Sequence, residues 1–383
     1  MQLLKTALIC AIPLMLAVAC RADDAADLVG NAVPLDTIHT PRTDVPAEYT
    51  TGQDGGTVPY QDNPLCTANM GPTLSITTEL LVWKLESGVD QPLVINPVTL
   101  APRLTTDDMG FGYQPGMKTD VQYLSPEEDS AFEVLYYGVY DWTDNREIDA
   151  PPFVRLPQDF GNFFNGAYSS PPTPAQLQAG THDWATANAI TFQNRATFNS
   201  VEANLIWGGQ KTNSGVVFGP RYMGLYESFR MQAYSTVASP IAGSPPSVYN
   251  ISTRNDLLGA QVGFFYRQKS DCWEGYYYFK GGLYGNNCRQ DTFVTDDAGG
   301  VVIRNYSPSA SITASSLEAG VSLLRRINKT WLLRFGYDAI WIQDVARATD
   351  QLDFTTNPTA GSTMQFRQGA LMHGGNFGVE ARY

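Results

Sequence analysis

The sequence predicts an all-β fold: a single antiparallel up-and-down transmembrane β-barrel of about 10 to 12 strands, with long outer loops and short periplasmic turns. Two observations predict this fold. Apolar and polar residues alternate in one segment after another, as expected where every second side chain of a strand contacts lipid. The breaks between these segments also alternate in length, long then short, along the chain.

The end of the chain shows the alternation most clearly. Phe377, Val379, Ala381 and Tyr383 fall on one face of a strand at 376–383, because strand side chains alternate with a period of two. An aromatic residue that ends such a strand resembles the assembly signal of bacterial outer-membrane proteins. We therefore expect the barrel-assembly machinery to be a partner of the C-terminal strand. An edge strand of a soluble sheet is the alternative for this segment.

Ten segments have the alternating pattern. We expect strands at approximately 73–84, 117–124, 130–142, 195–208, 217–235, 252–267, 273–285, 312–325, 330–343 and 367–383. The short breaks are 125–129, 209–215, 268–272 and 326–329. Transmembrane barrels separate short periplasmic turns from long outer loops, whereas soluble sandwiches have no reason to do so. The break at 143–194 is long enough to contain another strand pair, which would make twelve strands.

The apolar faces of these strands carry aromatic residues at both ends. Trp331 and Trp341 lie ten residues apart on one face. That spacing is about 33 Å along a strand, which the usual strand tilt reduces to about 25 Å of membrane thickness. Two aromatic girdles at the membrane surfaces fit this separation. The predicted girdle residues are Trp273, Trp331, Trp341 and Tyr383.

Two segments test the pattern. On 130–142, the alternation places Trp142 on the apolar face, opposite Glu133. On 217–235, Arg221 and Glu227 share a face with apolar residues, so we expect a bulge or a different register there.

The opposite faces of the strands are polar, and we expect them to line the lumen. Their side chains either pair with one another and fill a narrow barrel, or border a small pore that prefers cations because acidic residues are in excess. Both alternatives stay open from the sequence. The predicted lumen-lining residues are Glu79, Glu202, Gln261, Glu274, Lys280, Glu318, Arg334, Asp338, Glu380 and Arg382.

The N-terminal region divides into two segments before the barrel at 73–383. Residues 1–22 predict a signal peptide, since Lys5 precedes an apolar run that is too short for a transmembrane helix. Cys20 also permits lipidation, although the residue three positions earlier is Ala where lipoprotein signals usually have Leu. Residues 23–72 lack periodicity and predict a flexible periplasmic segment or plug.

The composition agrees with aromatic-rich strands joined by turns, since the chain contains 20 Tyr, 18 Phe, 7 Trp and 34 Gly. A mean hydropathy of −0.21 is compatible with a barrel wall that exposes only every second residue to lipid. The net charge of −13 argues against a nucleic-acid partner. Outer-membrane lipid is the partner that the pattern predicts.

Cysteine and histidine spacing indicates no site chemistry. Cys272 and Cys288 lie on one predicted strand, about 50 Å apart, so we expect no disulfide between them. His39, His182 and His373 have no spacing typical of a metal site or triad, so we expect no metal, no cofactor and no catalytic residue. A barrel enzyme with a rim site near His182 is one alternative, and a secreted soluble β-sandwich that binds a ligand is another.

Several short segments resemble a known family. They are EANL at 202–205, GPRYMGLYE at 219–227, NDLLGAQVGFFY at 255–266, ELLVWKL at 79–85 and GNFGVEARY at 375–383. They look like the outer-membrane β-barrel proteins abundant in planctomycete-type bacteria and, more weakly, like the pore-forming major outer-membrane protein of legionellae. The resemblance covers about 73–383 and implies a bacterial outer-membrane location, with a role as a passive pore or a structural wall component. It supplies no catalytic residues, and it leaves a homo-oligomer open.

Overall fold

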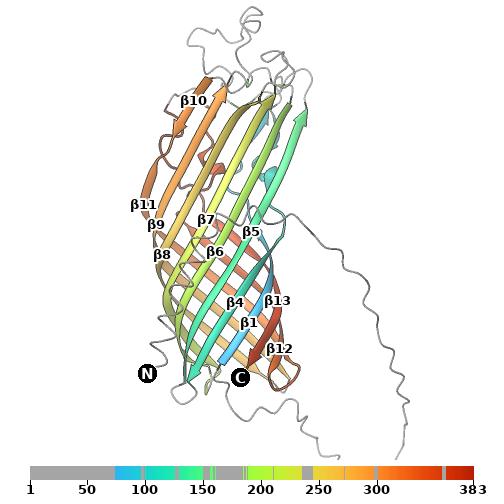
Figure 1. Cartoon of the computed structure of the whole chain (residues 1–383), viewed down its shortest axis with the longest axis vertical. Helices are drawn as coiled ribbons and strands as arrows, with labels where there is room; N and C mark the ends of the chain where they lie inside the picture. Colours follow the sequence, from blue (N-terminus) through green and yellow to red (C-terminus); the bar gives the residue numbers. More distant parts are fainter. Residues whose placement is uncertain are drawn as a thin grey trace, which may run out of the picture. The chain divides into compact units, whose positions relative to one another are not determined.

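Ten long antiparallel strands close into a barrel in this computed structural model, seen side-on in Figure 1. The predicted segments 1–22 and 23–72 lie outside the described residues. The structure describes residues 74–95, 99, 101–125, 129–149, 156–157, 160, 184, 187, 189–209, 211–234, 245–270, 272–296, 301–355 and 359–383.

Each barrel strand pairs with the next one along the chain, and the first pairs with the last to close the ring. The barrel strands are β1 (Leu74–Leu85), β4 (Gln114–Ser125), β5 (Ser130–Asp149), β6 (Ala189–Gly208), β7 (Ser214–Tyr234), β8 (Ser247–Lys269), β9 (Trp273–Asp296), β11 (Ser309–Arg326), β12 (Trp331–Gln343) and β13 (Ala370–Arg382).

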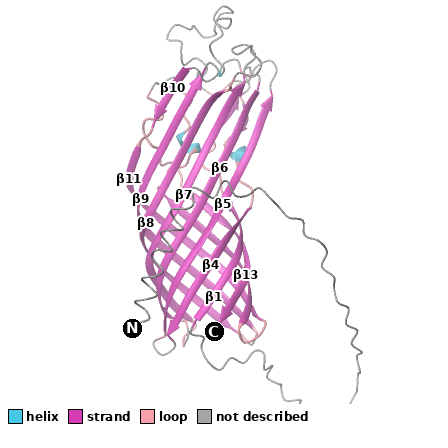
Figure 2. Cartoon of the chain, viewed as in Figure 1, coloured by secondary structure: helices cyan, strands magenta, loops and turns pink. Residues whose placement is uncertain are grey.

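Smaller elements lie in the connections. The strand β10 (Val301–Tyr306) pairs with the end of β9, and β2 (Pro92–Ile95) pairs with β3 (Pro102–Thr105) in a separate hairpin. Two short 3-10 helices, η2 (Asp107–Met109) and η4 (Thr349–Gln351), complete the described elements, and Figure 2 shows them in cyan. No helix among the described residues is long and apolar enough to cross a membrane.

The predicted segregation of loop lengths is confirmed. The connections β4–β5, β6–β7, β8–β9 and β11–β12 are short and lie at one end of the barrel, called here the short-turn end. The other connections are long and lie at the opposite, long-loop end. Because β5 pairs directly with β6 along both strands, the break at 143–194 adds no strand to the ring, which has ten strands and not twelve.

The two faces of the wall differ as the alternation predicts. On β1, Leu80 and Val82 are exposed on the outer surface, whereas Glu79, Leu81 and Trp83 are buried inside. Large apolar side chains are exposed in the same way on all the remaining barrel strands. A water-soluble monomer rarely exposes an apolar surface of that extent, and lipid is the solvent that suits it.

Inside the barrel, the side chains form two layers along its axis. On β1, Ser75, Thr77 and Glu79 point inward near the short-turn end, and Leu81 and Trp83 point inward beyond them. The inner face therefore changes from polar to apolar toward the long-loop end. The strand side chains of this apolar layer include Leu81, Trp83, Leu85, Tyr137, Val139, Trp142, Phe198, Met223, Leu225, Leu257, Ile340, Ile342 and Met372.

The structure corrects two expectations about register. The strand β7 pairs with β8 without any shift, so the bulge expected at 217–235 is wrong. Arg221 and Glu227 share a face with apolar residues because that face points into the lumen, where the apolar layer lies. A bulge occurs instead in β5, after Val139, and it turns Trp142 inward. The Trp142 indole Nε1–H then donates to the Trp83 carbonyl at 3.0 Å.

The cysteines behave as expected. Cys288 is a buried free cysteine within β9, whereas Cys272 takes part in a disulfide. The two are therefore not bridged to each other. The extended strand between them keeps them too far apart for a bond.

Candidate functional site

The ten side chains expected to line the lumen lie on β1, β6, β8, β9, β11, β12 and β13, on the faces that point inward. The side chains of Arg334 and Arg382 are 11% and 13% exposed. Together with Lys118 and Arg221, the ten residues form what we call the ionic layer. The buried members of the ten are Glu79, Glu202, Gln261, Glu274, Lys280, Glu318, Asp338 and Glu380.

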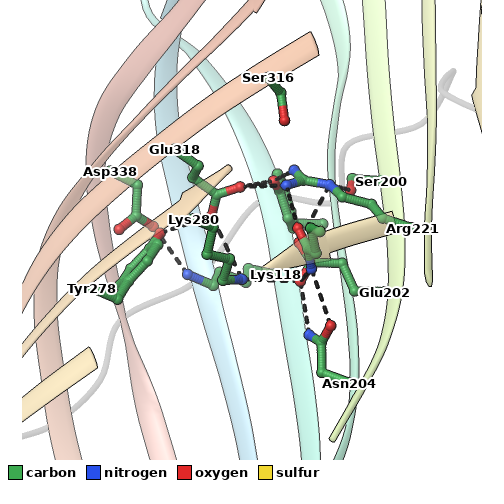
Figure 3. Close-up of polar contacts among 12 residues, drawn as sticks. Lys118, Ser200, Glu202, Asn204, Arg221, Tyr278, Lys280, Ser316, Glu318 and Asp338 are labelled. Atoms are coloured by element: carbon green, nitrogen blue, oxygen red, sulfur yellow. Dashed lines mark hydrogen bonds and ion pairs between the residues drawn. The ribbon is translucent and has the colours of Figure 1, made fainter. Parts of the chain in front are cut away.

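Arg221 lies at the centre of the ionic layer, where its side chain is 0% exposed (Figure 3). Its Nη1 lies 2.7 Å from Glu318 Oε2 and donates to Gln261 Oε1 at 3.0 Å. Its Nε lies 3.4 Å from Glu202 Oε1 and donates to Ser200 Oγ at 3.0 Å. The guanidinium thus holds two carboxylates from opposite sides of the lumen.

Lys280 provides a second positive charge for the same two carboxylates. Its Nζ lies 2.9 Å from Glu202 Oε2 and 3.8 Å from Glu318 Oε1. The hydroxyls of Tyr137 and Tyr278 donate to Glu318 at 2.8 and 3.0 Å. Each oxygen of Glu318 therefore has a hydrogen-bond donor and a nearby cation.

A second group of ion pairs lies beside β1. Arg334 Nε is 2.7 Å from Glu79 Oε1, and Lys118 Nζ is 3.0 Å from Asp338 Oδ2. The Asn376 amide donates to both Glu79 and Asp338, at 2.7 and 3.1 Å. Figure 3 labels Lys118 and Asp338 beside the Arg221 group.

The last group lies nearest the short-turn end. Arg382 Nη1 is 3.0 Å from Glu274 Oε2, and Arg382 Nε is 2.5 Å from Glu380 Oε1. Arg334 also approaches Glu380, at 3.8 Å, and so links this group to the one beside β1.

These pairs cross the barrel between strands that are not neighbours. Arg221 on β7 reaches Glu318 on β11, although β8 and β9 separate the two strands in the sheet. Lys118 on β4 reaches Asp338 on β12, past β1 and β13. Charges removed from water are stable only when they are paired and hydrogen-bonded. The lumen at this level is occupied by these side chains.

The apolar layer closes the lumen in a different way. The rings of Trp83 and Tyr137 meet at a centroid distance of 5.6 Å, and Tyr137 meets Phe198 at 5.9 Å. Part of the β12–β13 connection lies inside the barrel, where Val345 and Ala346 are 0% exposed.

A buried ion pair and a buried amide fix this inserted segment. Arg347 Nε lies 2.5 Å from Glu227 Oε1, and the Ala348 N–H donates to Glu227 Oε2 at 2.9 Å. The Asn255 side-chain amide donates to the Ala346 carbonyl at 2.9 Å. The inserted residues are thus bound to the inner faces of β7 and β8.

The four residues expected at the girdles are all on the outer surface. Trp273, Trp331 and Tyr383 lie near the short-turn end, and Trp341 lies farther toward the long-loop end. Their exposed fractions range from 40% for Trp341 to 61% for Tyr383.

The histidines form no catalytic or metal-binding group in the described part of the chain. His39 and His182 lie outside the described residues. His373 is on the outer surface, with Nδ1 2.6 Å from the Tyr337 hydroxyl and Nε2 2.8 Å from Glu86 Oε1. No group of three or more His, Cys, Asp or Glu side chains is arranged to hold a metal among the residues that the structure describes.

Arg221 and Lys118 are the members of the ionic layer that the sequence did not single out. Arg221 shares its face with apolar residues, so the alternation does not place it among the polar lumen residues. Lys118 lies at the start of a short predicted strand. The signal that could have found both was the excess of predicted inward carboxylates over predicted inward cations, which required further partners.

Residues 115–383 match the model of the family described as "Putative beta barrel porin-7 (BBP7)". The chain belongs to this family. The BBP7 match covers β4 through β13 almost completely, and with the closed barrel it identifies an outer-membrane β-barrel protein. No curated protein sequence matches the chain.

Solved structures similar to this BBP7 barrel include other outer-membrane proteins. The outer-membrane protease OmpT of Escherichia coli is 9% identical, with a TM-score of 0.42, and the match covers 81% of this chain and 96% of that one. A major outer-membrane protein of Thermus thermophilus is 10% identical, with a TM-score of 0.25 and coverage of 81% and 99%. The monoaromatic hydrocarbon channel CymD is 10% identical, with a TM-score of 0.29 and coverage of 84% and 91%.

Proposed function

We propose that this BBP7 protein is a closed barrel that serves as a structural component of the outer membrane and does not act as a passive pore. The observation that carries the proposal is the ionic layer, in which Arg221 and Glu202 at the centre of the lumen have no exposed side-chain surface. An aqueous channel needs water beside its lining groups. The apolar layer supports the same conclusion, because aromatic side chains and the inserted residues Val345 and Ala346 fill the lumen beyond it.

The orientation and partners are part of the proposal. The short-turn end faces the periplasm, and lipid surrounds the wall between girdles formed by Trp273, Trp331, Trp341 and Tyr383. The C-terminal strand β13 is the segment that the barrel-assembly machinery binds. The relation to planctomycete-type barrel proteins, and the weaker relation to the legionella pore, rests on the short segments quoted from the sequence.

We also propose that the protein is not an enzyme. The ionic layer offers no buried nucleophile beside a histidine among the described residues, and its carboxylates are held by cations. A soluble sandwich is excluded because the sheet is a closed ring. If a hydrolytic activity is found, a His182→Ala variant tests whether the alternative rim site near His182 is responsible.

Conductance of the purified full-length protein in planar bilayers tests the proposal. We expect no stepwise current, because buried side chains of the two layers occupy the lumen. Heat-modifiable migration on a gel and co-flotation with vesicles must show that the silent protein is folded and inserted. Stepwise currents from the wild-type protein would establish the passive pore instead.

A further inference from the structure

A small cavity lies within the ionic layer, toward the short-turn end. It is lined by residues of both charge signs and by aromatic rings from β8 and β9. Lys118, Lys280, Arg334 and Glu79 line it, but all four already have a partner in the ionic layer. Two other lining residues, Asp120 and Arg267, each have a buried polar atom without a hydrogen-bond partner among the described residues.

A carboxylate without a cationic partner among the described residues is on β4. Asp120 is 8% exposed and lines the cavity, and no described Lys, Arg or His lies within ion-pair distance of its carboxylate. Its Oδ2 accepts a hydrogen bond from Gln122 Nε2 at 2.8 Å, but its Oδ1 is buried and has no hydrogen-bond partner among the described residues. The neighbouring Glu133 lacks a described cationic partner as well, but amides of Gln122 and Asn204 donate to its two oxygens at 2.7 Å each.

A buried donor without a hydrogen-bond partner is on β8. The Arg267 guanidinium lies over the rings of Phe265 and Tyr276, at 5.6 and 5.3 Å from their centroids. Its Nε is buried and makes no hydrogen bond to a described residue. Arg267 forms a long ion pair with Glu274, whose Oε1 lies 3.9 Å from Nε, which is too far for a hydrogen bond.

These two atoms differ in what they require. A buried polar atom without a partner is costly, and bonds between charged groups are the strongest way to satisfy it. Asp120 requires a donor, preferably a cation, and Arg267 requires an acceptor, preferably an anion. A ligand that carries both charges satisfies both atoms without leaving a net charge in the cavity.

We propose that this cavity binds a small zwitterion of the α-amino-acid class, with its ammonium group at Asp120 and its carboxylate at Arg267. A divalent metal fits less well, because Lys118, Lys280, Arg334 and Arg267 line the same cavity and repel a second cationic charge. A simple anion fits less well because Asp120 and Glu133 repel it. This proposal does not depend on whether the barrel conducts.

Calorimetric titration of the full-length protein in detergent micelles tests the proposal. The probes are L-alanine, its amine half ethylamine, its acid half propionate, and calcium chloride. We expect saturable binding of L-alanine, and binding weaker by roughly tenfold or more for each half, because each half loses one charge-assisted contact. The variants Asp120→Asn and Arg267→Met should each weaken L-alanine binding by a similar factor.

Two controls keep the test decisive. Asp291→Asn changes an exposed carboxylate on the outer surface and should bind L-alanine like the wild-type protein. Arg267→Lys keeps the charge, and it should bind L-alanine better than Arg267→Met if the charge attracts the ligand carboxylate. Each variant must keep the heat-modifiable migration of the folded barrel.

Three outcomes overturn the proposal. Ethylamine binding equal to that of L-alanine, lost in Asp120→Asn and unchanged in Arg267→Met, indicates a site for organic cations only. Saturable calcium binding that L-alanine does not displace indicates a metal site. Absence of saturable L-alanine binding by the folded wild-type protein means that water alone satisfies the two atoms.

Discussion

The ionic layer and the apolar layer fill the same tube with side chains from the same strands, but they close it differently. In the ionic layer, long side chains such as Arg221 and Lys118 reach strands on the far side of the lumen. The apolar layer is filled by strand side chains such as Leu81 and Ile340, together with residues of a connection. There the β12–β13 connection enters the barrel and places Val345 and Ala346 inside. The ionic layer is thus built from strand side chains alone, whereas the apolar layer also contains an inserted segment.

The two layers should also differ in how they fail. Removing one member of a buried ion pair leaves its partner charged and unpaired, whereas removing a methyl group from an apolar core leaves only a small cavity. The four substitutions below test this difference, and they follow in order of expected effect.

The largest loss is expected for Arg221→Met in the ionic layer. It leaves Glu202 and Glu318 with Lys280 as their main cationic partner, and breaking a buried pair typically costs about 3 to 5 kcal/mol. Urea unfolding of the protein in lipid vesicles measures the free energy of unfolding of each variant. As a control, Arg254→Met breaks an exposed pair with Asp256 on the outer surface and should cost about 1 kcal/mol or less. Equal losses of unfolding free energy in the two variants would show that the ion pairs across the lumen do not stabilise the barrel.

A lysine on the outside should be nearly as damaging. Phe279 and Lys280 are neighbours on β9, but Phe279 is exposed on the outer surface and Lys280 faces Glu202. Phe279→Lys should cost about 2 to 4 kcal/mol, as found for Lys near the middle of the bilayer. The same unfolding measurement in vesicles gives this free energy. A loss below about 1 kcal/mol would place Phe279 at an interface and not in the hydrocarbon region.

The apolar layer should tolerate a small deletion. Ile340→Val removes one methylene group from a side chain that is 0% exposed and should cost about 1 kcal/mol. Urea unfolding in vesicles measures this as well. A cost close to that of Arg221→Met would mean that the inserted segment leaves the lumen when its packing changes.

The smallest effect is expected at the outer surface. Hydrogen bonds from Lys84 and then His373 lower the pKa of Glu86 from its ordinary 4.5. A carboxyl with a lowered pKa in the folded state adds stability above its unfolded pKa and loses it as the pH falls through the lowered value. Glu86→Gln should therefore reduce stability slightly at neutral pH and leave it unchanged at a pH well below the lowered pKa. An equal effect at both pH values would rule out this ionic contribution.

Much of the fold could be predicted because outward-facing and inward-facing side chains alternate along each strand of a membrane barrel and differ in polarity. On β12, Trp331, Trp341 and Asp338 were assigned to the correct faces. The alternation fails where both faces are apolar. On β7 the alternation could not indicate that Met223 points into a filled lumen. Arg221, on the same face as Met223, therefore did not fit the expected pattern.

The rest depends on contacts between distant residues. A bulge such as the one after Val139 reverses the faces beyond it, and nothing in the local pattern marks it. The partner of Arg221 is 97 positions away on the far wall, a relation that only the closed ring creates. Asp120 and Arg267 were missed as a pair for the same reason.

The bonds between Leu74 and Tyr383 carry a consequence for biogenesis. The Tyr383 N–H donates to the Leu74 carbonyl at 2.8 Å, and β1 finds its second neighbour only in β13. Because β1 is synthesised before β13, one edge of β1 stays open to any other strand until β13 pairs with it. A chain that lacks β13 has two such edges, on β1 and β12, where copies of the chain can pair with one another.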